Sequence, residues 1–161
     1  MSSVRKVVLW LFVVNLGIAF GAGLYEARIA VPDWIRTTDA GYRWDAEAAR
    51  EANTGLRFWV YVTTGPLTLL TLASLVAAWR APAPLRTWWL AAAALAVADR
   101  VFTFSYFIPA LGRLTGAEAA APDAVEQALR WASPNHVRHA LLLAAWLSAL
   151  RALSLLGRYD R

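Results

Sequence analysis

The stretch Val7–Leu24 reads VVLWLFVVNLGIAFGAGL and carries no charged side chain. A helix of this length is about 27 Å long, which is close to the thickness of the hydrocarbon core of a bilayer. Arg5 and Lys6 precede the stretch and Pro32 follows it. It therefore predicts a membrane-spanning helix, which we expect to continue to Ile29.

Three other apolar segments follow, and together with the first they predict four spans. We expect these spans at residues 7–29, 55–79, 87–110 and 134–156. Of the 161 residues, 59% are hydrophobic and only 17% are charged, whereas a soluble domain of this length needs more polar cover. The sequence thus predicts an all-α fold, an integral membrane four-helix bundle, in which residues 1–161 form a single domain.

The connections between the spans differ in length. Residues 80–86 (RAPAPLR) suffice only for a tight hairpin, whereas residues 33–54 and 111–132 form two large loops. In the first loop, Asp45–Glu51 (DAEAARE) is rich in helix-forming residues and predicts a short surface helix. Ser133–Pro134 fits the N-cap and the first helical position of span four.

Four spans place both termini and the 80–86 hairpin on one side of the membrane. Arg5, Lys6, Arg80 and Arg86 lie on that side, close to span ends and without acidic neighbours. Compact basic clusters of this kind are typical of the cytoplasmic side. We therefore expect an integral protein of the bacterial inner (plasma) membrane with both termini in the cytoplasm.

The composition also excludes several classes of chemistry. There is no cysteine, so disulfides, thiolate metal ligands and a cysteine nucleophile are all absent. The formal net charge of +5 comes from basic residues beside apolar runs, and membrane lipid with anionic headgroups is the expected partner. Because no contiguous basic patch exists, we expect no nucleic-acid binding.

Many of the nine tryptophans lie toward the ends of the apolar runs. An indole ring prefers the headgroup boundary, where its N–H reaches water. We expect this boundary position, in preference to aromatic core packing, for Trp10, Trp34, Trp59, Trp79, Trp88 and Trp89.

Polar side chains inside the spans are costly, so each needs a reason. Helical spacing of three and four residues puts several of them on shared faces. On span two, the shared face carries Arg57, Tyr61, Thr64, Thr68 and Thr71. The other spans contribute Glu26, Asp99, Arg100, Tyr106, Asn135, His136, Arg138 and His139. The sequence predicts that they line a pocket between the helices that opens toward the two large loops.

Each of these residues also has a purely structural interpretation. The threonines of span two can bond backbone carbonyls or neighbouring helices. Asp99 and Arg100 are adjacent and should not face each other, whereas an ion pair between Asp99 and Arg138 on span four is as well supported as a functional role. Arg57 and Arg138 can extend their charged ends to the headgroups.

His136, His139 and Glu26 allow two interpretations. Two histidines and a carboxylate resemble the 2-His-1-carboxylate ligand set of iron, but the pattern is weak and we predict no metal and no cofactor. A histidine also titrates near neutral pH and suits general acid–base catalysis. We expect His136 or His139 to act as the base.

Three stretches resemble the family of small four-span membrane proteins named for anthrone oxygenases. They are Gly21–Trp34 (GAGLYEARIAVPDW), Phe104–Leu111 (FSYFIPAL) and Trp131–Arg138 (WASPNHVR). The last is similar to a Trp-x-x-x-Asn-x-x-Arg signature that opens helix four in that family. The resemblance implies a four-helix membrane bundle and, for some members, oxidation of a tricyclic anthrone by molecular oxygen without a cofactor.

By position, the resemblance carries over Pro32, Pro109, Trp131, Asn135 and Arg138. The family often has an asparagine beside the proline at the end of helix three, whereas this chain reads Ile-Pro-Ala there. Because of this departure, the resemblance does not by itself assign the family's substrate or activity to this chain.

Our leading hypothesis from the sequence is a membrane enzyme that acts on a hydrophobic aromatic or polyketide-like small molecule as a cofactor-free oxygenase. In this hypothesis a histidine is the base, Glu26 orients it, and Arg138 holds the anionic oxygen with Asn135. The predicted substrate-binding residues are Asn135, Tyr61, Tyr106, Asp99, Arg100, Arg57 and Thr64. The alternatives are a non-catalytic protein that binds lipid or a small molecule, a partner subunit, and, last, a transporter; formation of a homo-oligomer stays open.

Overall fold

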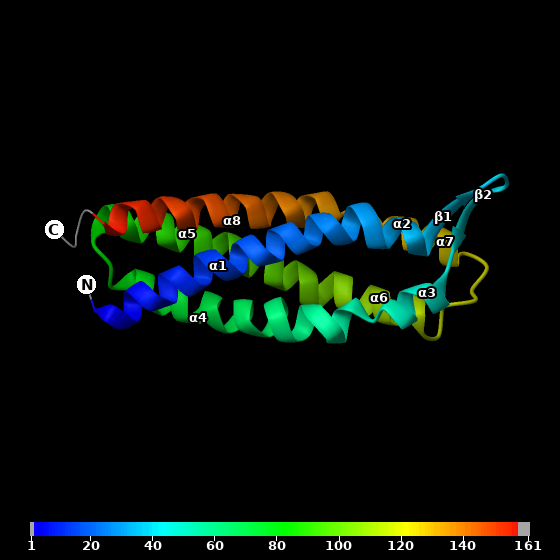
Figure 1. Ribbon diagram of the computed structural model, residues 1–161, viewed down its shortest axis with the longest axis horizontal. Helices are drawn as coiled ribbons and strands as arrows, with labels where there is room; N and C mark the ends of the chain where they lie inside the picture. The colour runs from blue at the N-terminus through cyan, green and yellow to red at the C-terminus, as the bar shows by residue number, and fades with distance from the viewer. Residues whose placement is uncertain (1, 158–161) are drawn as a thin grey trace.

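The structure, a computed structural model, describes residues 2–157 and is almost entirely helical (Figure 1). Within this range, four helices are long and apolar enough to cross a membrane: Ser3–Trp34, Gly55–Trp79, Ala83–Thr115 and Ala124–Leu156. Each expected span lies inside one of them. The chain is therefore an all-α integral membrane protein, a four-helix bundle in which the first and last helical turns lie at the same end (Figure 1).

Three of the long helices contain a π-helical segment, in which an N–H bonds the carbonyl five residues earlier, and the fourth is broken. The first consists of α1 (Ser3–Tyr25), η1 (Glu26–Ala30) and α2 (Val31–Trp34). The second consists of η2 (Gly55–Thr64) and α4 (Gly65–Trp79). The third consists of α5 (Ala83–Phe102), η3 (Thr103–Phe107) and α6 (Ile108–Thr115). The fourth consists of α7 (Ala124–Ala132) and α8 (Asn135–Leu156).

The helices α1, α4, α5 and α8 form the membrane half of the molecule. α5 packs against α4 and α8, and α1 packs against the same two helices. Their buried side chains share one core that includes Leu9, Phe12, Leu85, Trp89 and Leu142. In lipid, every backbone group must be bonded within the protein, and a helix achieves this by itself.

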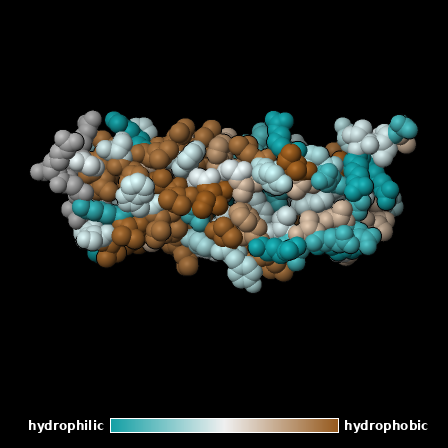
Figure 2. Space-filling model, in the orientation of Figure 1, coloured by the Kyte–Doolittle hydropathy of each residue, from teal (hydrophilic) through white to brown (hydrophobic). Residues whose placement is uncertain are grey.

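The outer surface of this half is apolar. Leu69 is 71% exposed and Val76 is 65% exposed, which in water would be unfavourable but suits contact with lipid tails. Figure 2 shows hydrophobic side chains over most of the bundle and hydrophilic ones at the end away from the termini. Lys6 and Glu26 are twenty residues apart, or about 30 Å of helix. This separation places Glu26 near the far boundary of the hydrocarbon.

Beyond this boundary the chain forms a cap, which we define as residues 27–58 and 107–134. Its most prominent part is an antiparallel hairpin of β1 (Ile35–Thr38) and β2 (Gly41–Trp44), which projects from the end of the molecule (Figure 1). Gly41 has a φ of +118°, a conformation that the tight turn requires and that glycine adopts without strain.

The cap has a core of its own, separate from that of the membrane half. It contains Trp34, Trp44, Phe107, Leu114 and Trp131. The indole N–H of Trp44 donates to the Leu114 carbonyl at 3.1 Å, and that of Trp131 donates to the Phe107 carbonyl at 3.2 Å. These bonds satisfy two buried donors and tie the hairpin and α7 to the third long helix.

Each of the three π-helical segments ends two residues before a proline. The residue before each proline donates its N–H five residues back: Val31 to Glu26, Gly65 to Val60, and Ile108 to Thr103. The following proline has no N–H, so the carbonyl four residues before it loses its usual donor. At Pro66 this is the carbonyl of Val62, and the side-chain amide of Asn15 on α1 donates to it at 2.9 Å.

Several sequence predictions about the cap need correction. The short surface helix is confirmed as α3 (Ala46–Ala52). The 111–132 segment is not a loop throughout, because α6 continues into it and α7 ends it. Ser133 does not cap α8 with its side chain, since Pro134 occupies the N-cap position.

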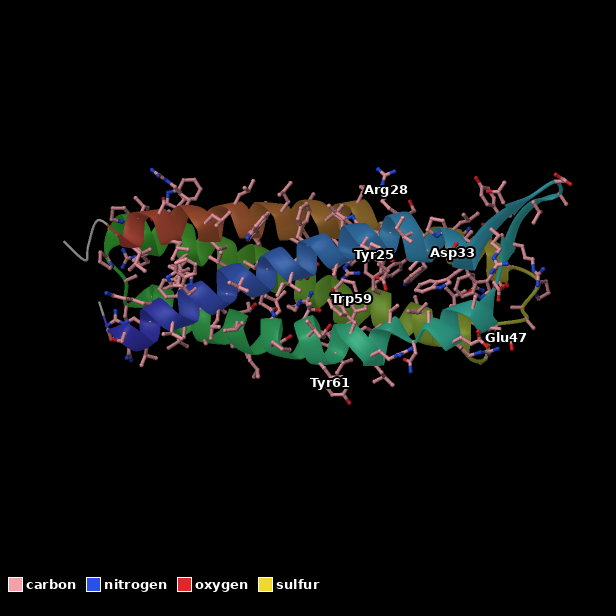
Figure 3. The ribbon with its side chains drawn as sticks, viewed as in Figure 1. Tyr25, Arg28, Asp33, Glu47, Trp59 and Tyr61 are labelled. Atoms are coloured by element: carbon pink, nitrogen blue, oxygen red, sulfur yellow. The ribbon has the colours of Figure 1, made fainter. Side chains whose placement is uncertain are left out.

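The tryptophan prediction is half right. Trp10, Trp79 and Trp88 are exposed at the end of the bundle nearest the termini. Trp34 and Trp89 are instead buried in the two cores, and Trp59 faces the interior (Figure 3). For Trp34 and Trp89 the core-packing interpretation is the correct one, whereas Trp59 is only partly buried and donates to Glu26 near the hydrocarbon boundary.

Candidate functional site

A cavity of about 540 Å³ lies where the membrane half meets the cap. η2 forms one wall, with Leu56, Trp59 and Thr64, and α6 forms the opposite wall, with Ile108 and Leu111. Its volume lies in the range of sites that bind small molecules, and most of its lining is apolar.

Aromatic rings make up much of the rest of the cavity. Trp34, Phe107 and Trp131 line it from the cap core, and Trp59 lines it from η2. The rings of Trp34 and Trp131 lie 6.4 Å apart, and those of Phe107 and Trp131 lie 6.2 Å apart. Such a set of rings favours a flat, hydrophobic occupant.

All three π-helical segments contribute side chains to this cavity. Glu26 comes from η1, Trp59 and Thr64 come from η2, and Thr103 and Phe107 come from η3. A π-helical turn interrupts regular bonding, and such turns occur frequently at functional sites. Their convergence marks this cavity as the candidate site.

Glu26 is the acidic group of the cavity. Its Oε1 accepts a hydrogen bond of 2.8 Å from the Thr54 hydroxyl and one of 2.7 Å from the Trp59 indole. Both bonds connect the first long helix to the start of the second. They fix the carboxylate in place, while its Oε2 accepts no bond from residues 2–157.

Two basic residues line the same cavity: Arg50, which is exposed and donates to the Thr115 carbonyl, and Arg138, which is partly buried. The guanidinium carbon of Arg138 lies 4.5 Å from the centre of the Phe107 ring, and its Nε lies 3.5 Å from Oδ1 of Asp99. Asn135 accepts a long hydrogen bond of 3.4 Å from Nη1 of Arg138. The ion pair between Asp99 and Arg138, one of the two interpretations that the sequence left open, is therefore present.

Asp99 also pairs with its neighbour Arg100, against the expectation that the two could not face each other. Nε and Nη2 of Arg100 both donate to Oδ2 of Asp99. Adjacent residues on a helix point about 100° apart at Cβ, but the arginine side chain is long enough for its guanidinium to reach the carboxylate of Asp99. Asp99 is fully buried and holds two guanidinium groups.

Thr103 adds an uncommitted polar group. It lines the cavity, only 4% of it is exposed, and its hydroxyl has no hydrogen-bond partner among the described residues. A buried hydroxyl without a partner costs free energy that a ligand oxygen can recover.

The two histidines, predicted as bases, do not line the cavity. His136 is exposed, and its Nδ1 donates to the Ser133 carbonyl at 2.6 Å. His139 packs against Gly23 of α1, where an added methyl group would lie 3.1 Å from its Nε2. Within residues 2–157, no three histidine or acidic residues approach closely enough to hold a metal ion, so the 2-His-1-carboxylate set is not assembled.

The remaining predicted residues divide into two groups. Thr64 lines the cavity, whereas Tyr106 stacks on Phe102 beside it and donates to the Arg130 carbonyl. Arg57 is exposed and Tyr61 is 73% exposed, and Tyr61 points away from the bundle (Figure 3). The single polar face predicted for span two is wrong there, because η2 has more residues per turn than an α-helix.

No family model, curated protein or solved structure matches this chain. The resemblance to the anthrone oxygenase family therefore has no independent support. Of the five residues that the resemblance carries over, Trp131, Asn135 and Arg138 lie together, whereas Pro32 and Pro109 do not line the cavity. Trp131 and Arg138 both line the cavity, and Asn135 contacts Arg138.

The sequence does not identify Thr54, Trp59 and Phe107 as site residues. Trp59 lies two residues from Tyr61, and in a regular helix these two side chains diverge by about 200°. The available signal was Pro66, since a proline within a span indicates irregular bonding upstream. That signal points to a distortion but gives no direction for each side chain.

Proposed function

We propose that this protein is a membrane-embedded enzyme that binds a flat, hydrophobic aromatic molecule in the cavity and oxidises it with molecular oxygen. The observation that carries the proposal is that one carboxylate, Glu26, and the part-buried guanidinium of Arg138 both line a mainly apolar cavity with four aromatic residues, while the second arginine of the lining, Arg50, is exposed and donates to the Thr115 carbonyl. Such a cavity can orient a polar edge of the ligand toward the two charged groups.

The chemistry follows from these two groups. The free Oε2 of Glu26 takes a proton from an activated CH₂ of the substrate, and Arg138 with Thr103 stabilises the negative charge on the conjugated oxygen. Oxygen adds to the carbanion, Glu26 returns its proton to the resulting peroxide anion, and loss of water from the hydroperoxide leaves a carbonyl. The balance is CH₂ + O₂ → C=O + H₂O. Because a carboxylate is a weak base, the CH₂ must be acidified by flanking aromatic rings.

This assignment changes the roles expected from the sequence. Glu26 becomes the base instead of the group that orients a histidine, and Arg138 keeps its role. Support comes from the position of Asp99, which holds the Nε side of Arg138 and leaves its charge directed at the cavity.

The test uses the purified protein in lipid nanodiscs with a tricyclic anthrone, and oxygen uptake as the readout. We expect Glu26→Gln and Arg138→Gln to lower kcat at least 100-fold, which is the usual size of a lost acid–base or oxyanion contribution. His136→Asn is the matched control, because His136 is exposed outside the cavity. Full activity in Glu26→Gln would exclude this mechanism.

A second candidate function is non-catalytic binding of the same class of molecule. It is favoured by one observation, namely that Oε1 of Glu26 is already bonded to Thr54 and Trp59, as expected of a structural carboxylate. Mass spectrometry of the purified protein separates the two. A bound aromatic that remains unchanged in the presence of oxygen supports the binding protein, and its conversion to the ketone supports the enzyme.

For location, we propose the inner membrane of a bacterium with the termini in the cytoplasm. The support is the compact basic cluster of Arg5, Lys6, Arg80 and Arg86 at that end of the bundle. In the structure Arg5 donates to the Arg80 carbonyl at 2.9 Å, which joins two parts of this cluster.

A further inference from the structure

Arg100 was expected in the same pocket as Glu26 and Arg138, but it faces a different space. It lines a groove of about 500 Å³ between α4 and α5 that opens to the lipid-facing surface. Only 6% of Arg100 is exposed. Two of its nitrogens donate to Asp99, but Nη1 is buried without a hydrogen-bond partner among the described residues.

Arg100 supplies the only charge in this groove. The other lining residues are apolar or carry hydroxyl groups. The hydroxyls of Thr68, Thr71 and Ser105 already donate to backbone carbonyls one turn earlier in their own helices. Among the side-chain donors of the residues that line this groove, Nη1 of Arg100 is the one without a partner among the described residues, so it can donate to an acceptor that a ligand brings.

The charge balance favours an acceptor that is anionic. Asp99 carries one negative charge and is shared by Arg100 and Arg138, so these three residues together carry +1. Glu26 lines the other cavity together with Arg138 and forms no ion pair with Arg100 among residues 2–157. A buried guanidinium with an unbonded nitrogen in an apolar surrounding is costly until it meets a negative group.

The depth of the groove indicates what kind of anion reaches it. Arg100 lies six residues before Tyr106 on the third long helix, or about 9 Å inside the hydrocarbon boundary. The apolar end of the groove, with Leu72 and Val97, lies further toward the bilayer centre. A single acyl chain along these residues would run parallel to the lipids of the leaflet beside the cap, with its tail toward the bilayer centre. Its polar end would lie at Arg100, deeper than the lipid headgroups.

We propose that this groove binds the ionised carboxylate of a long-chain fatty acid, with Nη1 of Arg100 as its hydrogen-bond donor and counter-charge. A carboxylate on one chain is small enough to enter between α4 and α5. A phospholipid carries two chains and a larger head that is anchored at the membrane surface, and it fits this position less well. The site is separate from the cavity of Glu26 and does not depend on the proposed function.

The experiment measures binding of [1-¹³C]oleate to the full-length protein in nanodiscs, by native mass spectrometry and by the carboxyl carbon signal. We expect saturable binding of one oleate, at least tenfold weaker in Arg100→Gln. Val101→Trp, which fills the groove from an exposed lining position, should weaken binding as much. Val76→Trp is the matched control on the exposed face of α4 and should bind normally.

Three results would overturn the proposal. The first is equal affinity of the wild type for oleate and for its uncharged methyl ester, because the carboxylate would then be irrelevant. The second is unchanged binding in either folded variant, Arg100→Gln or Val101→Trp. The third is displacement of oleate by phosphatidylglycerol at equal concentration, which would assign the groove to a phospholipid. Val101→Trp leaves the ion pairs of Arg100 intact, so the test remains decisive if Arg100→Gln fails to fold.

Discussion

Among single residues, Trp59 makes the contact on which the cavity most depends. Its indole donates to Glu26 at 2.7 Å, and this bond joins the first two long helices at the membrane boundary. Trp59→Phe keeps the ring and removes the donor. We expect a loss of about 1.5–3 kcal/mol in the free energy of unfolding, the usual value for a hydrogen bond to a charged group.

Thermal unfolding in detergent measures this loss. Trp10→Phe is the matched control, since Trp10 is 56% exposed on α1 and faces lipid. In Glu26→Gln the same Trp59→Phe exchange should cost clearly less, because the charge is gone. If Trp59→Phe lowered the free energy of unfolding equally in the wild type and in Glu26→Gln, Trp59 and Glu26 would not be energetically coupled.

Asp45 links the stability of the cap to pH. It caps α3 by accepting from the Ala48 amide at 3.0 Å, and this hydrogen bond, with Arg36 and Arg43 nearby, lowers the pKa of Asp45. The folded-state pKa of Asp45 lies below the unfolded value of about 3.9. The ionised Asp45 side chain therefore contributes its full stabilisation of α3 above that value. The contribution is lost as pH falls through the lower, folded value.

We therefore expect the protection factors of the α3 amides, which compare measured with intrinsic exchange rates, to fall on the order of severalfold as the pH is lowered from 5 to 3. Hydrogen exchange with mass spectrometry of the segment 41–52 reports it. Asp45→Asn keeps a capping oxygen but does not titrate, so its protection should be independent of pH in this range. An identical pH response in the variant would show that another group controls α3.

At the level of elements, the break at Pro66 shows how one helix compensates for another. Proline removes the donor for the Val62 carbonyl, and Asn15 of α1 supplies one instead. Asn15→Leu should cost about 1–3 kcal/mol, because it leaves that carbonyl without a partner in lipid. In Pro66→Ala the new N–H can bond Val62, so the same Asn15→Leu exchange should cost less.

The measurement is a double-mutant cycle of unfolding free energies in mixed micelles. A coupling energy near zero would mean that the Asn15 bond does not compensate for the proline. Leu11→Ala, on the lipid-facing side of α1 and 51% exposed, controls for general effects of truncation on that helix.

The elements also show how much of the structure the sequence reveals. The four spans, the 80–86 hairpin and α3 follow from apolar length and helix propensity, which act locally. The π-helical segments do not, because a turn of this kind depends on which neighbour satisfies a freed carbonyl, as Asn15 does for Val62. The error for Tyr61 has this origin, since one wider turn upstream of Pro66 changes the direction of the side chains before it.

The site is also predictable only in part, because some of its residues give a local signal in the sequence and others depend on tertiary contacts. Glu26, Arg138 and Thr64 were identified because charged and hydroxyl groups are conspicuous in an apolar helix. Trp59 was not distinguished from the tryptophans at the boundary, because its contact with Glu26 joins residues 33 positions apart. Long-range pairing of this kind is fixed by tertiary packing and leaves no local pattern.

For the whole molecule, the structure predicts a division into a zone in lipid and two zones in water. Termini and the 80–86 hairpin lie at one end and the β1–β2 hairpin at the other (Figure 1). Because the chain has no cysteine, single introduced cysteines give an unambiguous readout. In sealed vesicles, a membrane-impermeant maleimide should label Ser3→Cys and Ala83→Cys from one side and Thr37→Cys from the opposite side.

Leu69→Cys decides whether the exposed apolar surface faces lipid. Leu69 is 71% exposed, so in a water-soluble bundle this cysteine would react as fast as one at Thr37. It lies ten residues before Trp79, or about 15 Å from that end of the span, and a thiol at this depth meets neither water nor reagent. We expect no labelling until the vesicles are dissolved in denaturing detergent. Rapid labelling in intact vesicles, or labelling of Ser3→Cys and Thr37→Cys from the same side, would contradict the four-span arrangement and with it both proposed sites.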